Sequence, residues 1–502
     1  MDEKMLELPN SWVTVKLGDF VENEKGKKPK SESKTETASH SFPYVDIQAF
    51  EENVIRTWTD GVGCRLCYET DFLMVWDGSR SGLVGKGMNG ALGSTLVRIH
   101  FPSMVNDYAF YFLQSKYQQI NTRAKGVGIP HVDPALLWNY DFPIPPFNEQ
   151  HRIVAKIEEL FSELDTGVES LKIAQAQLKV YRQALLKHAF EGKLTAQWRA
   201  ENQEKLETAD AVLKRIQQER TQRYEQQLAD WEAAGKQGSK PKAPKSLPPL
   251  TAEELAELPE LPEGWGWVKY GDLCLIVRNG ISAKPEGDSG TPIFRISAVR
   301  PLFFDMADIR FVDNLAGEFD AYYLERGDLV FTRYNGSRHY VGVCAEYRSD
   351  EKRLFPDKLV QTRVFSKQMS ISYLEKALNS GASRRFIESK IRTTAGQSGV
   401  SGDDIKNIPV PICTTDEQIQ IVAELESKLS EANQLDQTLT IALQQAEALR
   451  QSILKKAFSG QLVAQDPNDE PAAALLARIK AQRTSANQKS ALVTRRKRKE
   501  TV

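Results

Sequence analysis

The chain has 502 residues, of which 41% are hydrophobic and 26% charged, a composition typical of a soluble globular protein. Its formal net charge of −1 excludes a general attraction to polyanions, so any nucleic-acid-binding surface must be a local patch. No apolar run reaches the ~18 residues of a membrane span, no secretory signal opens the chain, and five cysteines are too few for a disulfide framework. We therefore expect a cytoplasmic protein with reduced thiols and no membrane contact.

An internal repeat organises the chain. The matching segments come in the same order in both halves: LPNSW from Leu8 with LPEGW from Leu261, EQHRIVAKIEEL from Glu149 with EQIQIVAELESK from Glu417, and RQALLKHAFEGKLTAQ from Arg182 with RQSILKKAFSGQLVAQ from Arg450. The chain is therefore a tandem duplication with a unit of about 210–225 residues, and two copies are too few for a solenoid.

The first globular domain is expected over residues 1–148. FLMVW from Phe72 and STLVRI from Ser94 predict short strands, and YAFYFLQSKYQQI from Tyr108 predicts a helix. The domain therefore mixes helices and strands, an α/β composition.

A long helix is expected next, over residues 149–198. From Glu149 to Phe190 there is no proline and a single glycine, which allows a rod of roughly 63 Å. Apolar residues spaced seven apart predict a coiled-coil seam along it, formed by Ile157, Leu164, Leu171, Leu178 and Leu185.

Residues 199–260 are expected to hold a polar helix, from about Thr208 to Ala234, and a linker. The linker, GKQGSKPKAPKSLPPL from Gly235, is dominated by lysine, glycine and proline, which favour a solvated and partly extended segment.

The second half repeats this order. A second globular domain is expected over residues 261–416, with a strand at DLVFTR from Asp328 and a helix near SYLEKALN from Ser372. A second long helix is expected over 417–465, and a short helix with a basic tail over 466–502. The tail, TRRKRKE from Thr494, is either a disordered end or a segment that touches DNA phosphates.

The two long helices are expected to pair antiparallel within one chain. The second seam alternates large and small residues, Leu425, Ala432, Leu439, Ala446 and Ile453, and complements the leucines of the first. Two alternatives stay open at this stage: each helix packs only on its own domain, or it pairs with a second copy of the protein.

No catalytic or metal-binding motif is found. SGLVGKG from Ser81 lacks the spacing of a phosphate-binding loop, and Ile144-Pro145-Pro146-Phe147 lacks the amide or acid of a base-flipping motif. Cys64-x-x-Cys67 has no second ligand pair nearby, as a zinc site would need. We therefore expect no catalytic residue, metal or cofactor in this chain, and a binding or scaffolding component in place of an enzyme.

Duplex DNA is a target that suits this arrangement. Two repeats related by a pseudo-two-fold axis can place one domain in each of two major grooves about one helical turn apart. Because the two domains differ in sequence, the two half-sites would differ as well. The alternative is a coiled-coil adaptor whose two domains bind proteins, which the low net charge favours mildly.

The sequence resembles the specificity (S) subunit of type I restriction-modification systems. The resemblance spans essentially the whole chain and is carried by the two LPxxW segments, by PIPPFNEQHRIVAKIEELFSELD from Pro143, by HAFEGKLTAQW from His188 and by TAGQSGVSGDDIKNIPVPICTTDEQ from Thr394. The second copy departs from the pattern, since it lacks Pro-Pro and has one residue more before Glu417.

The resemblance implies two target-recognition domains that read a bipartite, asymmetric sequence in double-stranded DNA, with the long helices setting the spacing. It also implies two methylation subunits, which dock on the repeats, and a nuclease/translocase subunit. S-adenosylmethionine, ATP and Mg would belong to those partners.

Two segments of each domain are candidates for DNA contact, because glycine lets a backbone approach phosphates and arginine or asparagine can read base edges. They are Asp77–Gly82 and Lys125–His131 in the first domain, and Asn335–Arg338 and Thr394–Gly399 in the second. The candidate contact residues are Ser79, Arg80, Lys125, His131, Asn335, Arg338, Gln397 and Ser398. The alternatives are a tight turn with a solvated arginine, or loops that only pack against the start of the long helix.

Overall fold

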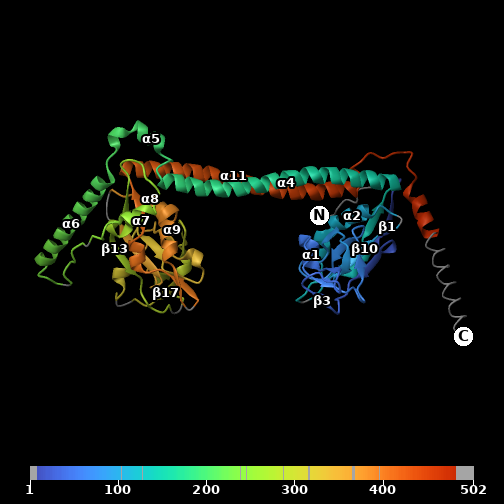
Figure 1. The fold of residues 1–502 in the computed structure, drawn as a ribbon, viewed down its shortest axis with the longest axis horizontal. Coiled ribbons are helices and arrows are strands. Elements are labelled where there is room, and N and C mark those ends of the chain that lie inside the picture. Colours follow the sequence, from blue (N-terminus) through green and yellow to red (C-terminus); the bar gives the residue numbers. More distant parts are fainter. Residues whose placement is uncertain are drawn as a thin grey trace. The chain divides into compact units, whose positions relative to one another are not determined.

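The computed structural model describes residues 8–481 except 103, 127, 238, 245, 286–287, 315–316, 365–367 and 395. The chain divides into two compact units, one formed by 1–173 with 439–502 and the other by 174–438. Each unit therefore combines segments of both sequence repeats (Figure 1). The basic run from Thr494 lies outside the described residues. Within the described ranges, no helix has the length and apolarity needed to cross a membrane.

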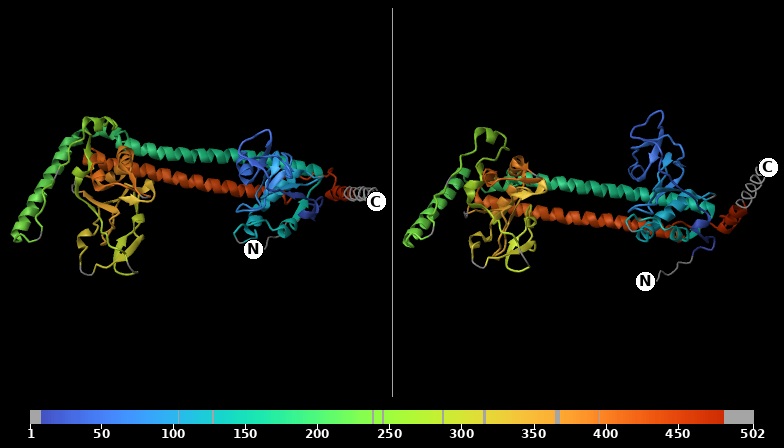
Figure 2. Two further views of the ribbon diagram at one scale, coloured as in Figure 1. Left: turned by 60° about the horizontal axis from the view of Figure 1, so that its bottom comes forward. Right: turned by 90° about the horizontal axis from the view of Figure 1, so that it is seen from below.

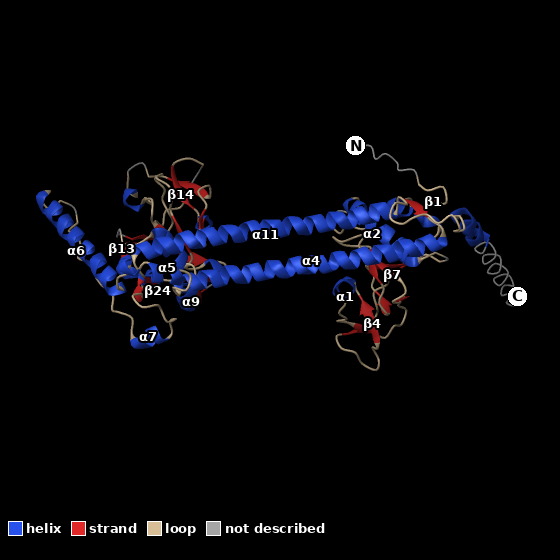
Figure 3. Ribbon diagram, turned by 90° about the horizontal axis from the view of Figure 1, so that it is seen from above, coloured by secondary structure: helices blue, strands red, loops and turns tan. Residues whose placement is uncertain are grey.

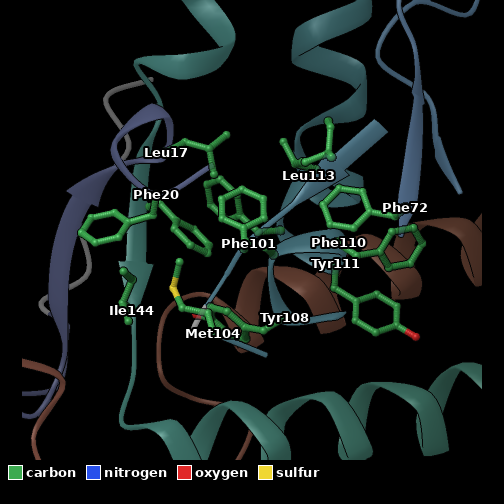
Figure 4. Close-up of a cluster of buried hydrophobic side chains, with 14 of the residues drawn as sticks. Leu17, Phe20, Phe72, Phe101, Met104, Tyr108, Phe110, Tyr111, Leu113 and Ile144 are labelled. Carbon is green, nitrogen blue, oxygen red and sulfur yellow. The ribbon is translucent and has the colours of Figure 1, made fainter. Parts of the chain in front are cut away.

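The core of the first unit is an antiparallel four-stranded sheet in the order β2 (Glu22–Lys25), β10 (Leu96–His100), β7 (Phe72–Val75) and β8 (Val84–Lys86). Every side chain of β7 is buried, because the strand is covered on both faces. Phe72 and Met74 join the aromatic cluster of α2 (Asn106–Thr122), which Figure 4 shows with Phe101, Tyr108 and Phe110. Leu73 and Val75 pack on the opposite side.

A second sheet of this unit lies over that opposite side. Its order is β3 (Glu32–Ser33), β5 (Trp58–Thr59), β4 (Phe42–Val45), β9 (Gly90–Leu92) and β6 (Leu66–Cys67), with β4 and β9 parallel. Helix α1 (Ile47–Glu52) follows β4, and its N-terminus is capped by Asp46, whose carboxylate accepts from the backbone N–H of Ala49.

The first unit also contains a layer of helices, which begins directly after a two-stranded sheet. β1 (Val13–Lys16) pairs with β11 (Asp141–Ile144), and Pro145-Pro146 lead directly into α4 (Phe147–Phe190). The first part of α4 runs beside the last part of α11 (Thr415–Ala457), as Figure 2 shows. Asp165 of α4 and Arg450 of α11 form an ion pair there. Residues 472–481 are helical and add apolar side chains to the same core, namely Ala472, Leu475, Leu476 and Ile479.

The second unit repeats the central sheet with the same order and orientation. The strands are β13 (Cys274–Asn279), β21 (Leu359–Val364), β18 (Leu329–Thr332) and β20 (Cys344–Glu346). Leu329 and Phe331 of β18 pack in one buried cluster with α8 (Ile371–Leu378) and α9 (Gly381–Lys390), and Val330 packs in another. The two domains therefore share one scaffold, although their sequences differ strongly.

Smaller sheets complete the second domain. β14 (Thr291–Phe294) pairs with β17 (Ile309–Val312), and β15 (Val299–Arg300) pairs with β16 (Phe303–Phe304). A three-stranded sheet has the order β19 (Tyr334–Asn335), β23 (Gln397–Gly399) and β22 (Arg392–Thr394).

The helical layer of the second unit mirrors that of the first. β12 (Gly266–Lys269) pairs with β24 (Pro409–Ile412), and α11 begins at Thr415. The short α5 (Ala196–Glu201) lies beside the first turns of α11 (Figure 3), and α6 (Ala209–Ala233) follows it in the chain. Only the start of α6 is buried, through Ala209, Val212, Ile216 and Arg220.

The long helices pack together antiparallel in each unit, as expected for intramolecular pairing. Arg450 pairs with Asp165 in the first unit, and Arg182 pairs with Asp436 in the second. The ends of the helices also pack on the globular domains, since Ile157 and Ile453 belong to the first core and Leu185 and Leu425 to the second. Of the remaining predicted seam residues, Leu178, Ala432 and Leu439 are buried, and Leu164, Leu171 and Ala446 are half-buried.

Both long helices end earlier than the segments in which they were expected, since α4 ends at Phe190 and α11 at Ala457 and not at 198 and 465. The end of α4 coincides with the end of the proline-free run, and Gly192 beyond it has φ of +69°, a left-handed conformation that ends a helix. Gly460 has φ of +73° at the matching place after α11. Each glycine packs against the proline of an LPxxW segment: a Cβ on Gly192 would lie 2.3 Å from Pro262 Cγ, and one on Gly460 2.4 Å from Pro9 Cγ.

Candidate nucleic-acid interface

In the first domain, the two candidate segments lie side by side. The backbone N–H of Gly78 donates to the carbonyl of Pro130 at 2.7 Å, and Asp77 and His131 form a β-bridge. Lys125 and His131 exchange two backbone hydrogen bonds of 2.9 and 2.7 Å, which close the second segment into a hairpin. These segments are about 50 residues apart in the sequence, and the structure brings them together.

Arg80 lies at the surface of the turn. Its side chain is 60% exposed, and its guanidinium forms an ion pair of 2.9 Å with Glu51 of α1. Ser79 is also exposed, and its carbonyl accepts from the side-chain amide of Asn121. Both candidate side chains are therefore accessible to a ligand, although the charge of Arg80 is partly compensated.

Lys125 and His131 differ in their exposure and in their partners. The Lys125 ammonium pairs with Asp133 at 2.8 Å, and this contact lowers the pKa of the Asp133 carboxyl. The Lys125 side chain is 62% exposed. His131 is half-buried and is held mainly through its backbone, so it supports the hairpin more than it projects from it.

In the second domain, the two candidate segments also meet, here as neighbouring strands. Asn335 of β19 pairs with Ser398 of β23. The Ser398 side chain is buried, and its hydroxyl lies 2.9 Å from that of Thr393, whereas Gln397 is exposed. Gln397 is thus accessible, and Ser398 belongs to the interior of the hairpin.

The arginine of the second turn is held differently from Arg80. The Arg338 guanidinium donates to the carbonyls of Glu388 at 3.1 Å and Ile391 at 3.4 Å. These carbonyls end α9, where a cation stabilises the helix dipole. Asn335 accepts from the N–H of Ser337 at 2.9 Å, which fixes the turn. Arg338 therefore acts as a tie between the turn and the helix.

Residues that position the turns were not found from sequence. Asn121 donates to the carbonyls of Ser79 and Ser81, and Arg384 donates to those of His339 and Val341. Each clamp comes from the helix packed behind its turn. An isolated asparagine or arginine on a helix carries no sequence signal for such a contact, because the contact depends on tertiary packing.

The buried thiols offer little reactivity. Burial raises the pKa of Cys67 to about 12, which keeps the thiol protonated and inert. Among the residues that the structure describes, no group of three or more His, Cys, Asp or Glu side chains could hold a metal ion. Chemically, these surfaces can bind and recognise, with glycine-containing turns and exposed cations as their main features.

Comparison with known proteins gives a consistent result. Residues 9–172 match the family model for the type I restriction modification DNA specificity domain. The chain is 33% identical over 384 residues to the type I restriction enzyme EcoKI specificity subunit of Escherichia coli (strain K12), covering 74% of this chain and 70% of that protein. It is 24% identical over 510 residues to the EcoDI specificity subunit of Escherichia coli, covering 96% of this chain and 98% of that one.

A solved structure shares the fold. The chain from work described as "Structural basis underlying complex assembly and conformational transition of the type I R-M system" superposes with a TM-score of 0.61 at 18% identity. The match covers 91% of this chain and 99% of the other.

Proposed function

The chain belongs to the family of type I restriction enzyme specificity subunits, and from this membership we propose that each of its two domains reads one half of a bipartite, asymmetric DNA sequence. One observation supports this most. In both domains a Gly-Ser-Arg turn after the central strand is hydrogen-bonded to a hairpin that precedes the last strand, through Gly78 and Pro130 or through Asn335 and Ser398. A shared scaffold with different side chains at this place suits two recognition sites of different sequence.

The chemistry of these turns fits a nucleic-acid backbone and base edges. Glycine permits a close approach of the main chain to phosphates, and exposed arginine, lysine and glutamine provide donors for base edges. The exposed members of the candidate set are Ser79, Arg80, Lys125, Arg338 and Gln397, and of these Arg338 is held by the end of α9. We assign His131, Asn335, Arg338 and Ser398 to the support of the turns.

The long helices serve two further roles in the proposal. Their length sets the number of base pairs between the half-sites, and their outer faces dock two methylation subunits. Ile173 and Ile441, which occupy the same place in the two repeats, are 49% and 53% exposed. Tyr181 and Leu449, another matching pair, are 45% and 51% exposed. Exposed apolar side chains that recur in both repeats suit two copies of one partner.

The catalytic steps belong to the partners in this proposal. S-adenosylmethionine would be bound by the methylation subunits, and ATP and Mg by the nuclease/translocase subunits, in the cytoplasm. We expect the purified chain alone to transfer no methyl group to DNA, and transfer of label in the absence of partners would contradict this role.

The test is to map methylated bases in a strain that carries the partner subunits and lacks other methyltransferases. We expect one bipartite sequence, whose first half changes when residues 8–143 are replaced by the matching domain of a relative. If methylation is absent or unspecific, and the assembled complex does not retain duplex DNA on a filter, the protein-binding adaptor is the better account.

A further inference from the structure

Hydrogen bonding identifies equivalent positions in the candidate hairpins of the two domains. The N–H of Val132 donates to the carbonyl of Trp76 at 2.9 Å, and the N–H of Val400 donates to that of Arg333 at 3.0 Å. Trp76 and Arg333 each come directly after the central strand of their domain. Val132 and Val400 are therefore the same position, and so are the residues before them, His131 and Gly399.

In this register, Lys125 of the first domain and Arg392 of the second occupy equivalent positions. His131 is bridged to Lys125 in the first hairpin, and Gly399 is paired with Arg392 in the second. Both cations are exposed at the base of their hairpins. The match is not visible in the sequence, because Lys125 and His131 differ in type from Arg392 and Gly399.

The capping residues of the helices that follow the two hairpins differ in charge. Two residues after His131, Asp133 caps α3 (Pro134–Trp138) and pairs with Lys125 at 2.8 Å. Two residues after Gly399, Ser401 caps α10 (Gly402–Lys406). The second domain therefore has a hydroxyl, which donates to Asp404 at 2.7 Å, where the first has the carboxylate that pairs with its cation.

The other candidate cation of the second domain is already engaged. Arg338 donates to carbonyls at the end of α9, and Ile391, one of its acceptors, directly precedes Arg392. The tie of Arg338 thus fixes the start of β22, on which Arg392 stands.

We propose that Arg392 is the cationic residue with which the second domain contacts its DNA half-site, and that Ser401 leaves this charge uncompensated. The proposal rests on the proposed function, because it assigns a contact within the same recognition site. It also implies that the two half-sites are bound with unequal electrostatic strength, since Lys125 is compensated by Asp133.

The test measures the affinity of the assembled complex for its cognate duplex. Arg392→Ala is expected to weaken binding by roughly tenfold to a hundredfold, as for loss of a direct DNA contact. Ser401→Asp is expected to weaken it in the same direction, because it introduces the carboxylate that the first domain has. Ser401→Asn is the matched control: asparagine caps a helix as well as aspartate does but adds no charge, so it should bind like the wild type.

A reciprocal change tests the same idea in the first domain. Asp133→Asn removes the charge that compensates Lys125 and is expected to tighten binding several-fold, with a steeper salt dependence. Thermal melting of each variant checks that the domain is folded.

The outcomes separate the inference from the proposed function. If the wild-type complex binds no duplex selectively, the proposed function fails. If it does, and Arg392→Ala binds like the wild type, or Ser401→Asp and Ser401→Asn behave alike, the assignment of Arg392 is wrong while the function stands.

Discussion

Arg80 and Arg338 occupy the same Gly-Ser-Arg turn but have different partners. Arg80 is 60% exposed and pairs with a carboxylate, Glu51. Arg338 donates to two carbonyls at the end of a helix. An ion pair at the surface is weak and exchangeable, so Arg80 can move to a ligand, whereas moving Arg338 would release the end of α9.

Arg80→Ala should therefore change recognition and leave stability unchanged. We expect a loss of about 1–3 kcal/mol in binding to cognate DNA, with relaxed specificity in the first half-site only. The measurement is the affinity of the complex for duplexes with either half-site altered. Glu51→Gln is the control, and it should bind at least as tightly as the wild type.

Arg338→Ala should have the opposite profile. Loss of the tie to Glu388 and Ile391 removes a favourable cation at a helix C-terminus, worth about 0.3–1 kcal/mol, and loosens the turn. We expect a lower melting temperature and weaker binding to the second half-site. A variant that melts normally but loses sequence preference would show instead that Arg338 reads bases.

Glu149 is a buried carboxylate with a predictable pH effect. It accepts from Trp12 Nε1 at 3.1 Å and from Gln465 Nε2 at 2.6 Å, and burial raises its pKa. The folded state then holds the proton more tightly than the unfolded state does. The stabilisation that the protonated Glu149 contributes is present at low pH and is lost as the pH rises through the raised pKa of the folded state.

Glu149→Gln removes this titration. We expect the stability of the wild type relative to the variant to fall as the pH is raised from about 4 to 8, in urea unfolding followed at each pH. A difference that stays constant, or that grows with pH, would mean that the carboxyl is not proton-linked to folding in this way.

One glycine in each domain lets the chain after the Gly-Ser-Arg turn pack on the helix behind it. Gly82 and Gly342 have φ of +92° and +72°. A Cβ on Gly82 would lie 2.5 Å from Ile120 of α2, and one on Gly342 would lie 2.7 Å from Ile387 of α9. A glycine with positive φ in close contact with an isoleucine of the helix thus occurs in both domains, although the helices differ in sequence.

Gly342→Ala should be costly and Gly336→Ala should not. The first combines a left-handed backbone with overpacking, which together cost about 2–4 kcal/mol. Gly336, in the same turn, has no atom within 4 Å of its Cβ position, so its change should stay within about 0.5 kcal/mol. The measurement is thermal or urea unfolding of both variants, and equal stability would contradict the packing argument.

The sequence predicted elements well where periodicity was strong. The strands at Phe72 and Asp328 and the helix at Tyr108 lie where apolar patterns placed them. β2 has the sequence ENEK, which has no strand pattern, and it forms because β10 offers an edge to pair with. Its polar side chains are used in ion pairs such as Glu24 with Arg98.

The candidate interface was predictable only as segments. Glycine and arginine marked the turns, but the partners of Arg80, Lys125 and Arg338 come from other elements and depend on packing. Arg392 was missed for the same reason, since its equivalence to Lys125 is visible only in the strand register.

In each unit, a segment of one repeat is hydrogen-bonded to a segment of the other repeat. Trp12 and Gln465 both donate to the carboxylate of Glu149, and Gln465 follows α11. Trp265 donates to Glu417 of the second repeat at 2.9 Å, and Glu417 also binds Thr195 and Arg199, which follow α4. A variant that lengthens either long helix therefore has to keep the hydrogen bonds of Glu149 and Glu417 at the helix ends.

This requirement decides where to lengthen the helices in a test of their role in spacing. Insertion near Gly192 would disturb the contacts of Pro262 and Glu417. Four helix-forming residues after Ile173 in α4 and four after Ile441 in α11 change both helices at matching places, far from the caps. Each insertion adds about 6 Å, and B-DNA rises about 3.4 Å per base pair.

The recognised spacer should then lengthen by about one to two base pairs, with the bases of both half-sites unchanged. Mapping of methylated sequences in a strain with the partner subunits measures this directly. The same four residues inserted after Lys240, in the linker that follows α6, should leave the spacer as it is, because they lengthen neither helix. A spacer that ignores the helical insertion, or follows the linker insertion, would mean that the helices only dock partners and that the distance between half-sites is set elsewhere.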